Sequence, residues 1–171
     1  MSTTTYDWTK FTKRILIDTT LEQAYFSFAS RKGMESWFLR LCEYKRNDIN
    51  LNPEELAIAG DIYKFLWHGW PDSTVENGSI ILADGCKNFG FTFNGNGANS
   101  MEVFIELTEM NTGCMVALTQ INIPNDIDSM AHWHLGCLEG WVFYLTNLKS
   151  VLEGGIDLRN KNFAITGVIN A

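Results

Sequence analysis

One continuous apolar stripe near the C-terminus constrains the fold more than any other feature of the chain. Its members recur every three or four residues: Met130, Trp133, Cys137, Trp141, Tyr144, Leu145, Leu148 and Leu152. A stripe of this length predicts one long amphipathic helix with a face that must be buried. Asp126, Asp128 and Ser129 are candidate N-caps, and Gly154 follows the stripe as a helix stop. The helix therefore needs a large apolar partner surface.

A sheet is the predicted partner, because apolar and polar residues alternate in the segments before the helix. The alternation is clearest from Met101 to Leu107, and strands are also predicted at 11–17, 63–67, 74–83, 89–93 and 114–123. Asn77-Gly78 within 74–83 is consistent with a two-residue hairpin turn or a bulge, and we favour the bulge. Gly95-Asn96-Gly97 is predicted to end the strand at 89–93.

Two short helices are predicted directly after the first strand. The first follows Asp18, Thr19 and Thr20 as N-cap candidates, and the second follows Gly33 with Met34, Trp37, Phe38 and Leu41 on one face. Residues 42–59 are expected to form a long loop with one helical turn at 52–55. The order predicts an α+β domain with a curved antiparallel sheet of about six or seven strands around the long C-terminal helix.

Charge and hydropathy exclude two classes of partner. The formal net charge is −7, and the densest basic group is only Lys45-Arg46. Neither nucleic acid nor an anionic membrane surface is expected to bind such a chain. No apolar run approaches the roughly 20 residues that span a bilayer.

The cysteines and the N-terminal residues predict a cytoplasmic protein. Cys42, Cys86, Cys114 and Cys137 are irregularly spaced, and residues 1–10 do not resemble a secretory signal. We expect free thiols in a reducing compartment.

Three strings resemble a known family. They are Gly33-Met34-Glu35-Ser36-Trp37-Phe38, then Gly60-Asp61-Ile62-Tyr63 followed by Trp67, and finally the segment His134–Trp141 with its continuation to Arg159. Together and in this order they resemble the START-like or SRPBCC superfamily, also called helix-grip or Bet v 1-like. The branch that they resemble is named for the activator of heat-shock protein 90 ATPase. The resemblance covers about 11–159 and treats 160–171 as a C-terminal extension of a single domain.

The resemblance implies a cavity between the sheet and the long helix that takes hydrophobic ligands. Aromatic residues make up 13% of the chain, with eleven Phe and six Trp. Their concentration on the strands favours a pocket over a solid aliphatic core, although any single one could simply be core. The residues that we expect on the cavity walls are Trp37, Tyr63, Phe65, Trp67, Phe91, Phe93, Gln120, Trp133, His134 and Trp141.

No metal, cofactor or nucleophile motif stands out. His132 and His134 would face apart on a helix, and His134 with Cys137 lacks the two further ligands of a tetrahedral site. Phosphate-loop, dinucleotide and nucleophile-elbow motifs are missing from the sequence. A cyclase-type enzyme would need only one or two polar groups in the cavity, such as His134, Tyr63 or Gln120, so enzymatic activity stays an open but disfavoured alternative.

Three functions compete at this point. The first is binding of a small apolar or amphipathic molecule, the second is surface interaction with a chaperone, and the third is a small cyclase- or hydrolase-type activity. Co-chaperones of this family usually carry an additional N-terminal domain, which this sequence is not expected to have. Trp70, in a predicted turn, is either a contact anchor or a lid over the cavity. A monomer and a homodimer are both compatible with the sequence.

Overall fold

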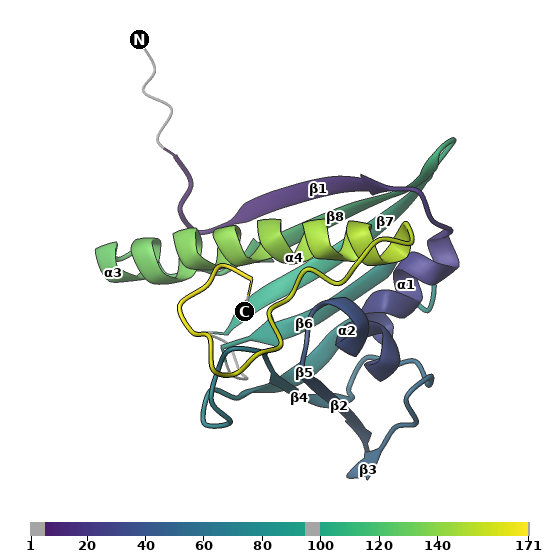
Figure 1. The fold of residues 1–171 in the computed structure, drawn as a ribbon, viewed down its shortest axis with the longest axis horizontal. Helices are drawn as coiled ribbons and strands as arrows, with labels where there is room; N and C mark the ends of the chain where they lie inside the picture. The colour runs from purple at the N-terminus through teal and green to yellow at the C-terminus, as the bar shows by residue number, and fades with distance from the viewer. Residues whose placement is uncertain (1–5, 95–99, 171) are drawn as a thin grey trace.

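In the computed structural model, which describes residues 6–94 and 100–170, the chain forms one antiparallel sheet with its helices on one face (Figure 1). The strands are β1 (Phe11–Ile17), β2 (Leu41–Arg46), β3 (Ile49–Asn50), β4 (Ile62–Leu66), β5 (Glu76–Ala83), β6 (Asn88–Phe93), β7 (Met101–Met110) and β8 (Gly113–Ile121). Their order in the sheet is β1-β8-β7-β6-β5-β4-β2-β3. The helices are α1 (Leu21–Ala29), α2 (Arg31–Trp37), α3 (Ile127–Ser129), the π-helical η1 (Met130–Leu135) and α4 (Gly136–Leu152). The predicted α+β helix-grip fold is confirmed.

The long C-terminal helix runs without a break from α3 through η1 to α4. Asp126 caps its start by accepting a hydrogen bond from the backbone N–H of Ser129 at 3.0 Å. Gly154 follows its end with a positive φ of 79°, which glycine adopts without steric cost. Figure 1 shows α4 lying along the sheet, while α3 at its start projects past the strands.

The second short helix begins earlier than the sequence predicted, whereas the first begins at Leu21, directly after its predicted N-cap Thr20. Ser30 separates them, and its side chain caps α2 by accepting from Gly33 N–H at 2.9 Å. The α2 helix therefore starts at Arg31 and not after Gly33, and it ends at Trp37, so that Leu41 belongs to β2. A Cβ on Gly33 would lie 2.2 Å from the carbonyl oxygen of Phe26, which explains why glycine is required where the helices meet.

The prediction of a long loop at 42–59 is wrong. Most of β2 lies there, pairs with β4, and forms a hairpin with β3 through Asn47 and Asp48, which have positive φ. The sheet therefore has eight strands, and not six or seven. The predicted helical turn at 52–55 is a single hydrogen-bonded turn from Glu55 N–H to Asn52 O at 3.0 Å.

Strand β5 passes straight through Asn77 and Gly78, so the hairpin alternative is excluded. Its register against β6 shifts between Ile80 and Leu82, which places the irregularity a few residues later than predicted. The turn predicted at Gly95-Asn96-Gly97 lies outside the described residues.

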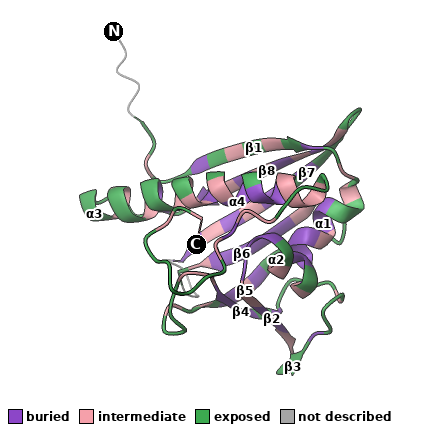
Figure 2. Cartoon of the chain, in the orientation of Figure 1, coloured by how far each residue is buried: buried purple, intermediate pink, exposed green. Residues whose placement is uncertain are grey.

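The core fills the space between the inner face of the sheet and helices α1, α2 and α4, as the purple segments of Figure 2 show. The extension after Arg159 adds no strand within its described part, 160–170, which runs as turns with Phe163, Ile165 and Ile169 exposed. None of the helices in the described part of the chain combines the length and the apolarity that a bilayer crossing requires.

Candidate functional site

The ten side chains expected on a cavity wall come from α2, β4, β6, β8, η1 and α4, with Trp67 just after β4. Seven are buried: Trp37, Tyr63, Phe65, Phe91, Gln120, His134 and Trp141. Three are half-buried: Trp67, Phe93 and Trp133. All but Gln120 and His134 belong to the apolar core or pack against it.

Phe38 lies at the centre of the aromatic contacts between α2 and α4. Its ring stacks on Trp141 at 4.9 Å and on Trp37 at 5.2 Å, and meets Tyr144 edge-on at 4.8 Å. Trp67 contacts the same ring edge-on at 5.8 Å. We call these five side chains the aromatic layer. Sequence reasoning placed Phe38 on a helix face but did not include it in the site, although its position next to Trp37 was the available signal.

A second aromatic group covers β4 and β6. Tyr63 stacks on Phe65 at 3.9 Å, and Phe91 meets both rings edge-on at 5.8 and 5.9 Å. The Tyr63 hydroxyl donates to the carbonyl of Thr92 at 2.5 Å. This bond fixes the ring across the sheet and satisfies its polar atom internally.

Gln120 and Trp141 form a buried polar bridge from the sheet to α4. The indole Nε1 of Trp141 donates to Gln120 Oε1 at 2.9 Å, and Gln120 Nε2 donates to the sulfur of Met101 at 3.3 Å. The bridge is neutral and surrounded by apolar side chains, so it orients the Trp141 ring without placing a charge in the interior.

His134 is held by the N-terminal segment. Its Nδ1 lies 2.8 Å from the carbonyl oxygen of Trp8, and its Nε2 lies 2.9 Å from the hydroxyl of Tyr6. Because the carbonyl can only accept, Nδ1 carries a proton and donates to Trp8, while Nε2 is hydrogen-bonded to the Tyr6 hydroxyl. The rings of Tyr6, Trp8 and Phe11 also surround the imidazole edge-on. Both nitrogens are thus occupied within the protein.

Burial keeps two hydroxyl groups and one thiol of this interior neutral. It raises the pKa of the Tyr144 hydroxyl to about 12, and it raises the pKa values of the Tyr63 hydroxyl and the Cys137 thiol above their ordinary values. All three groups therefore remain protonated at neutral pH, and they suit an uncharged or apolar ligand surface.

The three half-buried aromatic residues, Trp67, Phe93 and Trp133, share one end of the sheet, and we call them the rim. Strands β4, β6 and β8 run in the same direction, so their C-terminal ends lie at the same end of the sheet. Trp67 directly follows β4, Phe93 is the last residue of β6, and β8 leads into the helix that carries Trp133. The rim therefore lies at the end of the sheet where the C-terminal helix begins. The rim shares Trp67 with the aromatic layer, whose other rings all contact Phe38.

The polar side chains of this interior are bonded within the protein. Within residues 6–94 and 100–170, no three His, Cys, Asp or Glu side chains are grouped to hold a metal ion. The polar side chains that an enzyme would use, Tyr63, Gln120 and His134, each make the internal hydrogen bonds described above.

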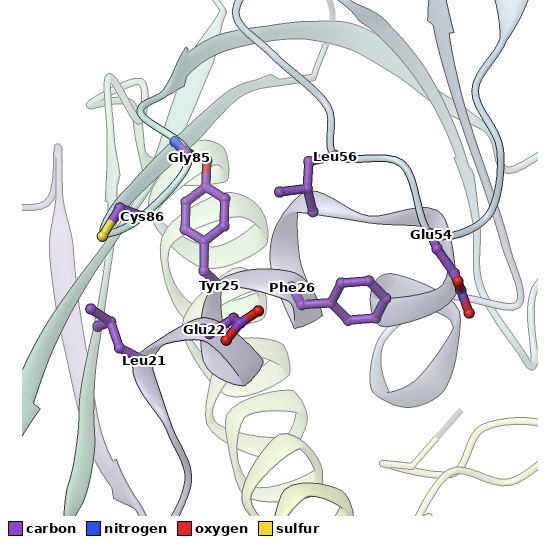
Figure 3. Close-up of a pocket in the computed structure, with 8 residues that line it drawn as sticks. All are labelled: Leu21, Glu22, Tyr25, Phe26, Glu54, Leu56, Gly85 and Cys86. Atoms are coloured by element: carbon purple, nitrogen blue, oxygen red, sulfur yellow. Dashed lines mark hydrogen bonds between the residues drawn. The ribbon is translucent and has the colours of Figure 1, made fainter.

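A separate hollow of about 550 Å³ lies on the other side of α1, and none of the ten residues lines it (Figure 3). It is lined by α1, by the segment around Leu56 and by the β5–β6 turn. Sequence reasoning gave no indication of it, because its lining comes from three segments that meet only in the folded chain.

The comparisons with known proteins agree with this architecture. The model of the family described as Activator of Hsp90 ATPase homolog 1-like protein matches residues 18–153. No curated protein sequence matches the chain.

Solved structures with the same fold include protein SSP2350 from Staphylococcus saprophyticus, which is 18% identical, covers 88% of this chain and 96% of its own, and has a TM-score of 0.66. The Aha1 dimer from Colwellia psychrerythraea is 21% identical over 85% of this chain and 97% of its own, with a TM-score of 0.63. Protein CV1439 from Chromobacterium violaceum is 20% identical over 85% and 98%, with a TM-score of 0.61.

Proposed function

This chain belongs to the Activator of Hsp90 ATPase homolog 1-like family, and on that premise we propose that it binds a small apolar or amphipathic molecule between the sheet and α4. The observation that carries the proposal is the combination of a neutral, aromatic interior with a half-exposed aromatic rim at one end. Large flat side chains supply much contact area for an apolar ligand at little entropic cost. We also infer that the protein acts in the cytoplasm, where its four free thiols stay reduced.

Entry of a ligand requires the rim and the aromatic layer to move. Trp133 lies in η1, whose π-helical turns are intrinsically less favourable than α-helical ones and recur at functional sites. We infer that η1 shifts when a ligand enters and that the Phe38–Trp141 stack opens.

Replacing Trp133 by alanine is expected to weaken ligand binding about tenfold, because it removes one aromatic face of the rim. The purified wild-type protein is first analysed by native mass spectrometry, followed by denaturing extraction of any bound molecule. A panel of lipids and aromatic metabolites is then screened for shifts in melting temperature, and Kd is measured for each binder.

Val142→Ala is the matched control, since Val142 lies exposed on the outer face of the same helix. It should leave the affinity unchanged. A wild-type protein that purifies empty and shows no melting shift with any panel member would rule out the proposed ligand site.

A second candidate is surface interaction with a chaperone, and two exposed aromatic side chains favour it. Trp70 is 54% exposed, and Phe163 is 61% exposed. The Phe163 ring lies 6.3 Å from His68 and 5.6 Å from the Arg40 guanidinium, so the extension and the β4–β5 loop lie together. Exposed aromatic side chains of this kind are typical anchors of protein interfaces.

The double variant Trp70→Ala, Phe163→Ala is expected to weaken any complex with a heat-shock protein 90-type chaperone by tenfold or more. Sedimentation velocity with the purified chaperone measures the complex, and the chaperone's ATPase rate gives a second readout. Ile49→Ala, at the exposed tip of β3, is the control. If the wild-type chain neither binds nor changes the ATPase rate, the second candidate is wrong.

A further inference from the structure

The hollow beside α1 has the size and lining of a ligand site, and it is separate from the proposed site under α4. Its volume of about 550 Å³ falls in the range of small-molecule pockets, roughly 300–1,000 Å³. Figure 3 shows its lining: Leu21, Glu22, Tyr25, Phe26, Glu54, Leu56, Gly85 and Cys86. We call it the α1 groove.

One wall of the groove is apolar and firmly held. Glu22, Tyr25 and Phe26 are spaced i, i+3 and i+4 on α1, which puts them on one face of the helix. The Tyr25 hydroxyl accepts a hydrogen bond from Gly85 N–H at 2.9 Å, and its ring is only 2% exposed. Leu56 stands opposite α1 across the opening in Figure 3. These contacts link helix, loop and turn into a preformed site.

The charge of the groove is negative. Glu22 and Glu54 line it, and no basic side chain does. Glu54 is already paired with Lys32 at 2.6 Å. Among the ion pairs of the described residues none involves Glu22, which leaves its carboxylate on the apolar wall without a counter-charge. The net charge of −7 on the whole chain adds to the attraction for a cation.

We propose that the α1 groove binds a small organic cation, an ammonium group on an aromatic or alkyl body. The ammonium group pairs with Glu22, and the half-buried Phe26 ring on the same helix face adds cation–π and apolar contact, while the buried Tyr25 holds the wall in place. The body lies between Phe26 and Leu56. An anion of the same shape is repelled by Glu22, and a neutral analogue loses the ion pair.

An exposed thiol makes the groove directly observable. Cys86 lines it and is exposed, whereas Cys42 and Cys114 are buried and Cys137 is half-buried. Alkylation by iodoacetamide should therefore modify Cys86 before the other cysteines, and a ligand in the groove should slow that reaction. Peptide mass spectrometry follows each cysteine separately.

The test titrates the full chain with phenethylammonium, 2-phenylethanol and phenylacetate, three probes of the same shape that differ in charge. We expect phenethylammonium to bind most tightly, with Kd on the order of 0.1–1 mM for so small a molecule, and to protect Cys86. Glu22→Gln should weaken it about fivefold, as suits an exposed ion pair. Glu139→Gln changes an exposed, unpaired glutamate on α4 and should have no effect.

Three outcomes would overturn the proposal. Equal affinity for the three probes, or unchanged affinity in Glu22→Gln, would show that the groove does not select a cation. Binding without protection of Cys86 would place the cation elsewhere. Leu56→Arg, which puts a positive charge at the opening, should abolish binding of phenethylammonium while leaving the ligand of the α4 site bound, so the two sites are tested separately.

Discussion

Replacing Arg159 by methionine is expected to lower the free energy of unfolding by about 2–4 kcal/mol, since it removes a buried charge that is fully hydrogen-bonded. The Arg159 side chain is only 1% exposed. Its guanidinium donates to Asp157 at 2.6 and 2.9 Å, and to the carbonyls of Leu39, Glu35 and Ser36 at 2.9, 2.9 and 3.0 Å. Methionine retains the apolar stem but removes this donor from the three carbonyls, while the Asp157 carboxylate keeps its bonds to Asn147 and Lys161.

These bonds join the end of α2 to the segment after α4. The carbonyls of Glu35 and Ser36 belong to the last turn of α2, where a positive charge also interacts favourably with the helix dipole. Asn147 on α4 reinforces the junction, because its Nδ2 donates to Trp37 O at 2.7 Å and its Oδ1 accepts from Leu158 N–H at 2.7 Å. Loss of Arg159 therefore loosens the helix that carries Trp37 and precedes Phe38.

Acid titration distinguishes this account from a simple packing defect. Burial by itself would raise the pKa of Asp157, but hydrogen bonds from Arg159 and Lys161 outweigh it and hold the pKa well below the ordinary 3.8. A lowered folded-state pKa contributes stability that is present above pH 3.8 and lost as the pH falls through the folded-state pKa. The wild-type protein should therefore lose more stability between pH 5 and pH 2 than Arg159→Met does, as measured by urea unfolding.

Lys161→Met is the matched control for this prediction. Lys161 pairs with the same carboxylate at 2.8 Å, but its side chain is 55% exposed, so its loss should cost less than about 1 kcal/mol. The pKa of Asp84 is also lowered, but its hydrogen bonds are the same in both variants. It therefore contributes the same pH dependence of stability to each of them. A cost for Arg159→Met no larger than that for Lys161→Met would contradict the assigned role.

The sequence predicted the elements whose two faces differ strongly. Residues Met101–Leu107 alternate between core and solvent, and the stripe on α4 faces a single partner, so local pattern and tertiary burial agree there. Strand β2 was missed because only Cys42 and Tyr44 point inward, between charged residues that resemble a loop. Its pairing with β4 depends on contacts about twenty residues apart, which a local pattern does not show.

The candidate site was predicted in composition but not in geometry. The aromatic residues between sheet and helix could be named from their spacing, whereas the central place of Phe38 depends on how α2 meets α4. The partners of His134 are Tyr6 and Trp8, which lie more than 120 residues away. The α1 groove likewise has no sequence signature. Contacts over such separations follow from the fold and are not encoded in any short motif.

Replacing Gly78 by alanine is expected to lower the free energy of unfolding by about 2–4 kcal/mol, since the added methyl group has no space. A Cβ at Gly78 would lie 2.4 Å from Thr92 Oγ1 and 2.5 Å from the Tyr63 hydroxyl oxygen. The Tyr63 ring must cross β5 at Gly78 to donate to the carbonyl of Thr92 on β6. Displacing it would strand a buried hydroxyl and disturb the stack on Phe65. Thermal and urea unfolding measure the loss.

Two comparisons isolate the cause of that loss. Gly140→Ala adds the same methyl group within α4, where nothing lies within 4 Å, and should stabilise the protein by about 0.5–1 kcal/mol through helix propensity. In a Tyr63→Leu background the cost of Gly78→Ala should fall, because the shorter side chain no longer crosses the strand. An equal cost in both backgrounds would mean that Gly78 serves the backbone of β5 or the space beside Thr92, and not the passage of Tyr63. The glycine that resembled a turn or a bulge in the sequence would then have a third role, and the position of Tyr63 in the proposed ligand site would need another explanation.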